Sequence, residues 1–295
     1  MDFNTAEELL ALCEKENKPI SSVMRLREIV YGEVDADEVE RRMKKSLGIM
    51  RNSAHEPLHN VVRSMGGMIG GEAEKLEKRR ADGKSICGNV LTKALIYSQA
   101  VLEVNASMGV IVAAPTAGSA GVVPAVLFAL EEEFGLSEET VLNGLFTAGA
   151  IGCLLMKNAS VSGAEAGCQA EIGSAAAMAS AAAVEMMGGT PEQCLDAAAI
   201  TISNMLGLVC DPIGGLVENP CQNRNAMGAS NALVAAELVL AGIKSITPID
   251  ETIEVMYAVG KSIPSELRET SMGGLAVAKS ACETCRACAE KRKKN

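Results

Sequence analysis

Aromatic side chains are nearly absent from this 295-residue chain, which contains no Trp, three Tyr and four Phe. Because 48% of the residues are nevertheless hydrophobic, the chain can bury a core made of Ala, Val, Leu, Ile and Met. Ala and Gly allow helices to approach closely, and the 15 Met residues fill irregular gaps in such a core.

An excess of positive charge is absent as well. The net charge of −10 favours a soluble protein and argues against nucleic acid as the main partner. The acidic, amphipathic N-terminus does not resemble a secretory segment, so the ten Cys residues predict a reducing cytoplasm. The uncharged run 104–130 is long enough to span a bilayer, but Pro115, Pro124 and several Gly interrupt it. We therefore expect a buried loop followed by a helix, and no membrane partner.

Strand signals are few and do not alternate regularly with helices, so the sequence predicts an all-α fold. We expect a compact multi-helix bundle over residues 1–279, with long buried loops that are rich in glycine or carry cysteine. Residues 280–295 are expected to form a cysteine-rich basic tail, and the Lys/Glu-rich segment 72–84 is the best candidate for an internal joint. Residues 210–225 are predicted as a loop before an Ala/Leu helix. N-cap patterns predict helices that begin at Thr5, Asp35, Ser137, Thr190 and Thr247.

Three single cysteines lie in polar, glycine-rich segments: Cys168, Cys210 and Cys221. A small chelating metal site would supply C-x-x-C pairs, and a disulfide framework is typical of short secreted chains. Three isolated thiols instead suit a cubane cluster that one loop is too short to enclose. Three thiolates for four irons leave one iron without a protein ligand, which is what catalysis needs. The alternative is that these are buried structural thiols.

The segment APTAGSAG precedes a predicted helix and contains no phosphate-binding G-x-x-x-x-G-K-[ST] motif. Its backbone N–H groups are suited to hold a substrate carboxylate, as helix N-termini hold anions. A tight packing turn is the alternative. The candidate substrate-binding residues of this loop are Pro115, Thr116, Gly118, Ser119 and Gly121.

The sequence resembles the α chain of iron–sulfur-dependent L-serine dehydratases in four motifs: NASMGVIVAAPTAGSAGVVPAVL, NASVSGAEAGCQAEIG, LGLVCDPIGGLVENPCQNRNA and RETSMGGLA. The likeness extends over about residues 35–279. It implies that Cys168, Cys210 and Cys221 hold a 4Fe–4S cluster and that L-serine is the substrate. In some members of the family a C-terminal cysteine occupies the open iron of the resting enzyme. Cys282 is the candidate for that position here.

The chemistry of L-serine deamination agrees with this resemblance. Hydroxide is a poor leaving group, and an open iron can act as a Lewis acid on the substrate hydroxyl. A base removes the α-proton, and the enamine product tautomerises and hydrolyses to pyruvate and ammonia. Such an ammonia-lyase would belong to amino-acid catabolism and gluconeogenesis.

Three further polar residues flank the cysteines. Lys157 is a candidate catalytic residue, and a Schiff base with pyridoxal phosphate is its alternative role, although no phosphate-binding cup accompanies it. Ser162 is a candidate substrate-binding residue in the segment before Cys168. Arg224, next to Cys221, is suited either to clamp a carboxylate or to form a structural ion pair.

Only two histidines are present, within the sequence His55-Glu-Pro-Leu-His59. Although this matches H-E-x-x-H, Pro57 would interrupt the helix that a zinc site needs, so a turn is predicted. The sequence therefore contains no residue that is an obvious general base. Single-chain members of the family carry an additional Ser-Ser-Ser-His-Thr motif, which this sequence lacks. The resemblance thus implies a separate β chain that completes the active site.

Two other functions stay open at this point. A related lyase that acts on L-cysteine and releases sulfide would use the same residues. A non-catalytic iron–sulfur sensor or scaffold would use the tail cysteines Cys282, Cys285 and Cys288 as its responsive element.

Overall fold

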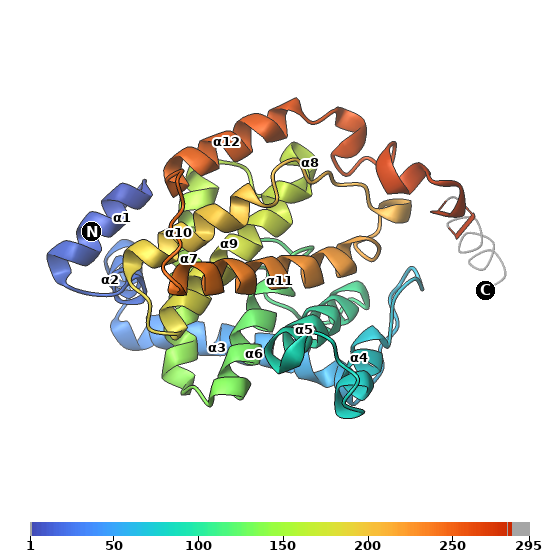
Figure 1. The fold of residues 1–295 in the computed structure, drawn as a ribbon, viewed down its shortest axis with the longest axis horizontal. Coiled ribbons are helices and arrows are strands. Elements are labelled where there is room, and N and C mark those ends of the chain that lie inside the picture. Colours follow the sequence, from blue (N-terminus) through green and yellow to red (C-terminus); the bar gives the residue numbers. More distant parts are fainter. Residues whose placement is uncertain (1, 282, 285–295) are drawn as a thin grey trace.

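The structure is a computed structural model that describes residues 2–281, 283 and 284. The helices α1–α12 and η1–η4 account for most of these residues, and no strand is found among them, so the predicted all-α fold is confirmed (Figure 1). The α-helices are α1 (Ala6–Glu16), α2 (Ile20–Gly32), α3 (Ala36–His55), α4 (Glu72–Ala81), α5 (Gly88–Ala106), α6 (Val122–Phe134), α7 (Glu138–Asn158), α8 (Gly163–Ala166), α9 (Cys168–Met186), α10 (Pro191–Ser203), α11 (Cys221–Leu240) and α12 (Ile249–Ser262). The 3-10 helices are η1 (Glu56–Leu58), η2 (Ile213–Gly215), η3 (Ser265–Leu267) and η4 (Gly274–Val277).

Side-chain caps begin several of these helices where the sequence predicts them. The hydroxyls of Thr5 and Ser137 and the carboxylate of Asp35 each accept a backbone N–H in the first turn of their helix. Thr190 and Gln193 form a reciprocal capping box at the start of α10, which also has Pro at its first position. These four N-termini are therefore fixed by local sequence.

Two predicted helix starts are displaced. α12 begins at Ile249 with Pro248 as its N-cap, one residue later than the Thr-Pro pattern indicates. α11 begins at Cys221, so the preceding loop is shorter than the predicted 210–225. The second difference matters for function, because it places the thiol of Cys221 at a helix N-terminus.

α9 passes through the middle of the bundle and is buried on nearly all sides by α6, α7, α10 and α11 (Figure 1). Its sequence is accordingly rich in Ala on every face rather than amphipathic. Glycines in neighbouring helices allow close packing. A methyl carbon added to Gly144 of α7 would lie 2.7 Å from the sulfur of Met186, and one on Gly228 of α11 would lie 2.8 Å from Ile172. The expected core of small and aliphatic side chains is therefore observed.

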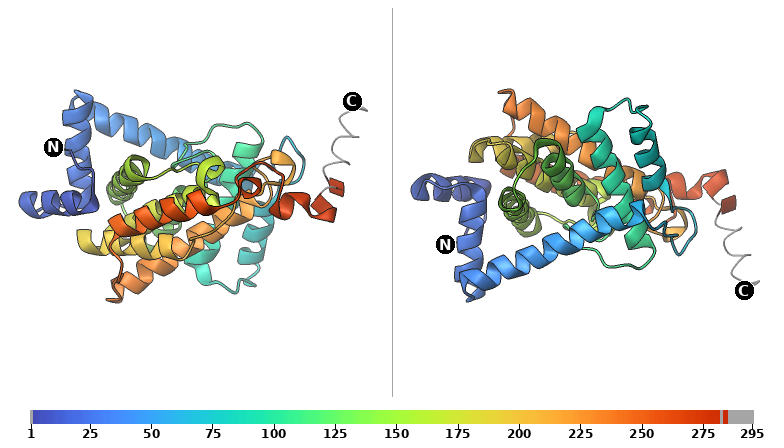
Figure 2. Two further views of the ribbon diagram at one scale, coloured as in Figure 1. Left: turned by 90° about the horizontal axis from the view of Figure 1, so that it is seen from above. Right: turned by 90° about the horizontal axis from the view of Figure 1, so that it is seen from below.

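The N-terminal and C-terminal parts of the chain lie at opposite ends of the molecule. Figure 2 shows α1 and α2 at one end, with α3 running from there along one side of the bundle. The segment 72–84, which the sequence favours as an internal joint, contains α4, and α4 packs directly against α5. It is thus part of the bundle.

The uncharged run 104–130 forms the end of α5, a loop and most of α6, so the predicted loop and helix are confirmed. The loop is buried only in part, because Val110 is 73% exposed. Among the described residues, α7 is long and apolar enough to cross a membrane, but 67% of its apolar window is buried within the bundle. Its apolar surface thus packs inside the protein, which is consistent with a soluble protein.

Candidate metal centre

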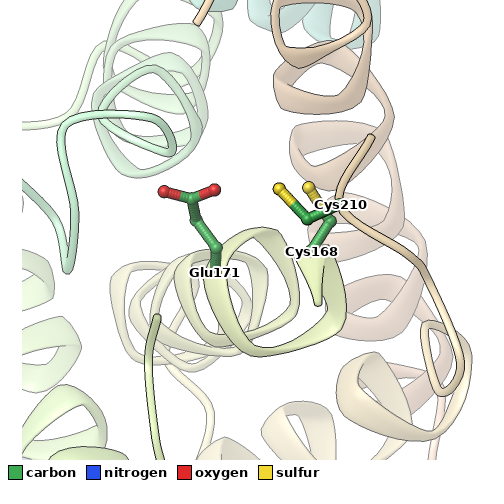
Figure 3. Close-up of side chains that lie close together, drawn as sticks. All are labelled: Cys168, Glu171 and Cys210. Atoms are coloured by element: carbon green, nitrogen blue, oxygen red, sulfur yellow. The ribbon is translucent and has the colours of Figure 1, made fainter. Parts of the chain in front are cut away.

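Two of the three predicted cysteines lie together with a glutamate. The sulfurs of Cys168 and Cys210 and a carboxylate oxygen of Glu171 all lie within 4.8 Å of one another. Figure 3 shows the two sulfurs and the carboxylate pointing to the same side of the first turn of α9. These residue types and distances make the cluster a candidate metal site.

The position of Cys168 depends on the glycine before it. Gly167 adopts a φ of 75°, and a methyl carbon on it would lie 2.7 Å from the carbonyl oxygen of Leu208. Glycine thus allows the 208–210 segment to pass directly over the start of α9. The backbone N–H of Gln169 donates to that same Leu208 carbonyl at 2.9 Å. This contact brings Cys210 next to Cys168.

Cys210 is held from its other side by the C-terminal part of the chain. Its N–H donates to the carbonyl of Leu267 at 2.8 Å, and its carbonyl accepts from the N–H of Glu269 at 2.7 Å. The thiol is buried, with 2% of the residue exposed. The motif RETSMGGLA near the C-terminus therefore contributes to the site by fixing the Cys210 backbone.

Cys221 is also buried and is the first residue of α11. Its sulfur does not belong to the group of atoms from Cys168, Glu171 and Cys210 that all lie within 4.8 Å of one another. Asn225, one turn further along α11, donates from Nδ2 to the carbonyls of Cys221 at 2.9 Å and Gly118 at 2.7 Å. Its Oδ1 accepts from the N–H of Gly121 at 3.1 Å. The hydrogen bonds of this fully buried amide connect the predicted substrate loop to α11, the helix that carries Cys221.

The thiols differ in their readiness to ionise. A hydrogen bond from the neighbouring Cys210 thiol and the positive charge of Arg224 lower the pKa of Cys168, against the effect of burial. Cys168 is also the first residue of a helix, where the partial positive charge favours a thiolate.

The contact with Cys168 and burial raise the pKa of Cys210. Burial, together with the negative charges of Cys168 and Glu171, raises the pKa of Cys221 to about 12. A cation that binds these thiols would therefore replace protons on at least two of them.

Arg224 forms an ion pair in the structure. Its Nη2 lies 2.7 Å from Oδ1 of Asp211, and its Nη1 donates to the carbonyl of Val209 at 2.8 Å and to the sulfur of Cys168 at 3.6 Å. Of the two roles that the sequence left open, the structural ion pair is the one observed. Its role as a carboxylate clamp stays a prediction.

Glu171 is the functional candidate that sequence reasoning missed. It lies three residues after Cys168, so the helical spacing places both side chains on one face of α9. Its carboxylate accepts a hydrogen bond from the hydroxyl of Thr116 in the predicted substrate loop. Burial raises the pKa of this carboxyl, with a further contribution from the negative charge of Glu269. Glu171 thus joins the thiols to the loop.

The predicted substrate loop is ordered by its own hydroxyls. The Thr116 and Ser119 oxygens lie 3.0 Å apart, and the N–H of Ser119 donates to the Thr116 hydroxyl at 3.3 Å. The N–H groups of Ala117 and Gly118 donate to no acceptor in the described part of the chain. Two free donors therefore remain in this loop, beside Pro115, whose peptide bond with Ala114 is cis.

Lys157, Ser162 and Cys282 are the remaining residues that the sequence predicts as part of the site. Lys157 lies at the end of α7, and its ammonium group contacts Asp2 at 3.1 Å and the Phe3 carbonyl at 2.6 Å, so its catalytic role stays a prediction. Ser162 is the N-cap of α8, directly before Gly163, where a methyl carbon would lie 3.0 Å from the Cys210 sulfur. Cys282 lies outside the described residues.

The two histidines lie where a turn is predicted. His55 is the last residue of α3, and η1 separates it from His59. The Nε2 atom of His55 lies 3.0 Å from a carboxylate oxygen of Glu132, and its ring contacts those of Tyr97 and Phe128. His55 therefore belongs to the packing between α3, α5 and α6.

Comparison with known proteins gives consistent matches. A family model described as "Serine dehydratase alpha chain" matches residues 12–276. The "Probable L-serine dehydratase, alpha chain" of Bacillus subtilis (strain 168) is 49% identical over 274 residues, which cover 93% of this chain and 91% of that protein. The "L-serine dehydratase, alpha chain" of Peptoniphilus asaccharolyticus is 46% identical over 277 residues, 94% of this chain and 95% of that protein. The longer "L-serine dehydratase TdcG" of Escherichia coli (strain K12) is 37% identical, and the match covers 94% of this chain and 62% of that protein.

Proposed function

Because the chain belongs to the serine dehydratase alpha chain family, we propose that it is the cluster-binding subunit of an L-serine ammonia-lyase. The chain is an enzyme of the lyase class, as its relatives are. The product would be pyruvate with ammonia, and the proposed setting is cytoplasmic amino-acid catabolism that feeds gluconeogenesis.

The residues of the candidate metal centre fit an iron–sulfur cluster. Cys168, Cys210 and Cys221 supply three buried sulfur donors, the ligand type that such clusters prefer. Arg224 places a positive charge beside one sulfur, which offsets the negative charge of several thiolates in a buried site. When bound, a 4Fe–4S cluster with three protein ligands supplies an open, Lewis-acidic iron for the substrate hydroxyl. Cys282 is retained in the proposal as the ligand that closes this position in the resting enzyme.

The loop that carries Pro115, Thr116, Gly118, Ser119 and Gly121 is proposed to bind the substrate carboxylate. The N–H of buried Gly118 carries this proposal, because a buried donor normally has an acceptor; the N–H of Ala117 beside it is exposed to solvent and is open to a ligand. Asn225 and the Thr116–Ser119 contact hold the loop in one conformation, so little entropy is lost when substrate binds. Ser162 lies beside the same site and is proposed to contact the substrate.

A second polypeptide is proposed to complete the active site. His55 pairs with Glu132, and the exposed His59 forms no side-chain hydrogen bond with the described thiols, so neither is assigned as the base. The α-chain names of the relatives support a separate β chain, and the longer E. coli relative has room for an additional domain in one polypeptide. We assign the general base to that β chain.

Pyruvate formation tests this function directly. The chain is reconstituted anaerobically with iron and sulfide, combined with its co-expressed β chain, and supplied with L-serine or L-cysteine. The proposal expects pyruvate and ammonia in equal amounts from L-serine, and loss of this activity in air as the exposed iron is lost. Release of sulfide from L-cysteine at a higher kcat/KM would instead assign the chain to the related L-cysteine lyases. A stable cluster without turnover of either amino acid would favour a sensor or scaffold.

A further inference from the structure

The carboxylate of Glu171 has no cationic partner among the residues that the structure describes. Its one hydrogen bond comes from the Thr116 hydroxyl, and no Lys, Arg or His side chain forms an ion pair with it. Two ionisable thiols lie within 4.8 Å instead. A partly buried carboxylate with acidic neighbours is stabilised poorly without a positive charge. A positively charged group that binds beside this carboxylate would therefore stabilise it.

The same carboxylate lies directly beside the free donors of the substrate loop. A methyl carbon on Gly118 would be 2.5 Å from Oε1 of Glu171, so the Gly118 backbone and the carboxylate are in close contact. The backbone of Gly118, whose N–H has no acceptor in the described part of the chain, therefore lies next to a carboxylate whose one hydrogen bond comes from Thr116. An α-amino acid carries its carboxylate and its ammonium group on one carbon. Adjacent donors and an adjacent acceptor match that arrangement.

Other acidic groups near the thiols are less suited to bind an ammonium group. Asp211 is engaged by Arg224 at 2.7 Å and by the N–H of Leu275 at 2.6 Å. Glu269 is exposed to solvent, where an ion pair contributes little. Of these three acids, Glu171 is the partly buried one that lacks a cation.

We propose that Glu171 binds the α-ammonium group of the substrate and thereby selects α-amino acids over hydroxy acids of the same shape. This inference rests on the proposed function, since it takes the Ala117–Gly118 donors as the carboxylate site. It also explains why residue 118 is glycine: any side chain would occupy the space between the loop and the Glu171 carboxylate.

The test compares L-serine with L-glycerate, in which a hydroxyl replaces the ammonium group. Because the anaerobic holoenzyme converts L-serine, the KM for L-serine and the inhibition constant of L-glycerate are measured under conditions in which chemistry limits the rate, together with iron content, for the unmodified protein, Glu171→Gln and Glu171→Asp. Glu171→Gln keeps the shape and removes the charge. We expect L-serine binding to weaken by about 10- to 100-fold, the effect of one charged hydrogen bond, while L-glycerate binding and iron content are unchanged. Glu171→Asp should recover part of the affinity.

A matched pair of glycine variants provides an independent measurement. Gly118→Ala displaces the Glu171 carboxylate without removing it and should weaken L-serine binding selectively. Gly173→Ala, two residues after Glu171 on α9, meets no atom closer than 3.8 Å and should bind as the unmodified protein does. This pair keeps the test decisive even where Glu171→Gln does not fold.

Three results would overturn the inference. Wild-type affinity of Glu171→Gln for L-serine would show that the ammonium group binds elsewhere. Equal weakening of L-serine and L-glycerate would show a general effect on the site, and loss of iron would identify Glu171 as a metal ligand. In each case the unmodified holoenzyme still converts L-serine, so the proposed function stands. Failure of the unmodified holoenzyme to bind or convert L-serine would overturn both.

Discussion

Arg224 of α11 donates a hydrogen bond to the sulfur of Cys168, the first residue of α9, across 3.6 Å. The guanidinium of Arg224 also pairs with Asp211, which in turn accepts the N–H of Leu275. One buried set of polar contacts thus connects a proposed cluster ligand to the C-terminal part of the chain. The Arg224 guanidinium places a positive charge beside the Cys168 sulfur, and Asp211 anchors η4 through Leu275.

Removal of Asp211 should destabilise the protein strongly. Asp211→Ala leaves the guanidinium of Arg224 buried without its carboxylate, and breaking a buried ion pair in this way costs about 3–5 kcal/mol. Urea unfolding of the cluster-free chain measures the change in the free energy of unfolding. Lys84→Ala is the control, because its pair with Asp82 is exposed and its removal should leave the unfolding midpoint nearly unchanged. A similar midpoint for both variants would contradict the structural role of Arg224.

The three cysteines should differ from the other thiols in iron binding. After anaerobic reconstitution, Cys168→Ser, Cys210→Ser and Cys221→Ser should each lose most of their iron and acid-labile sulfide, because thiolates are the cluster ligands. Cys87→Ser is the control, since this exposed thiol precedes α5 and lies outside the candidate site. Full iron content in Cys221→Ser would show that the smaller group around Cys168 and Cys210 binds metal by itself.

Gly274 should be essential for the contact between η4 and Asp211. It adopts a φ of 58°, and a methyl carbon there would lie 2.3 Å from Oδ2 of Asp211, so Gly274→Ala adds a steric clash to backbone strain. Gly242→Ala is the matched control, because Gly242 has a φ of 95° but no atom within 4 Å of the added methyl. Thermal unfolding and the rate of iron loss to a chelator should both change more in Gly274→Ala. Equal effects in the two variants would mean that only backbone strain matters.

The carboxylate of Glu132 should make stability depend on pH in the acidic range. Burial alone would raise its pKa, but hydrogen bonds from His55, Tyr97 and Lys93 lower the pKa of Glu132 to about 2. Because the folded-state pKa lies below the ordinary value of 4.5, the stabilisation is complete above that value and is lost as the pH falls towards 2. The difference in unfolding free energy between the unmodified protein and Glu132→Gln should therefore shrink from pH 6 to pH 2.

Urea titrations at several pH values measure this difference, with the exposed Glu254→Gln as control. A difference that stays constant over the whole range would contradict the assigned role of Glu132.

Local signals in the sequence were sufficient for much of the fold. The caps at Asp35 and Thr190 involve residues three apart, so contiguous sequence contains the whole interaction. The break before α9 is different: the small-residue run 164–187 predicts one continuous helix, whereas Gly167 separates α8 from the helix that carries Cys168 and packs against the distant Leu208. The absence of strands followed from the lack of regular alternation.

Contacts between distant segments were not predictable in this way. Thr116 and Glu171 are 55 residues apart, and Asp211 and Leu275 are 64 apart, so no local pattern relates them. The start of α11 at Cys221 was missed because Asn and Pro near this position favour a loop locally, whereas packing against α5 and α9 selects the helix. The spacing of three between Cys168 and Glu171 was the one available signal for Glu171, and it has meaning only once the helix start is known.

The state of the individual irons shows whether the substrate binds an open position of the cluster. Mössbauer spectra of the anaerobically reconstituted chain with its β chain are recorded with and without L-serine. We expect one iron in four to change its spectrum when L-serine is added, because three cysteines leave one iron free for the substrate hydroxyl. If all four irons are unaffected by L-serine while the cluster is intact, the cluster has no open position for this substrate and the account is contradicted.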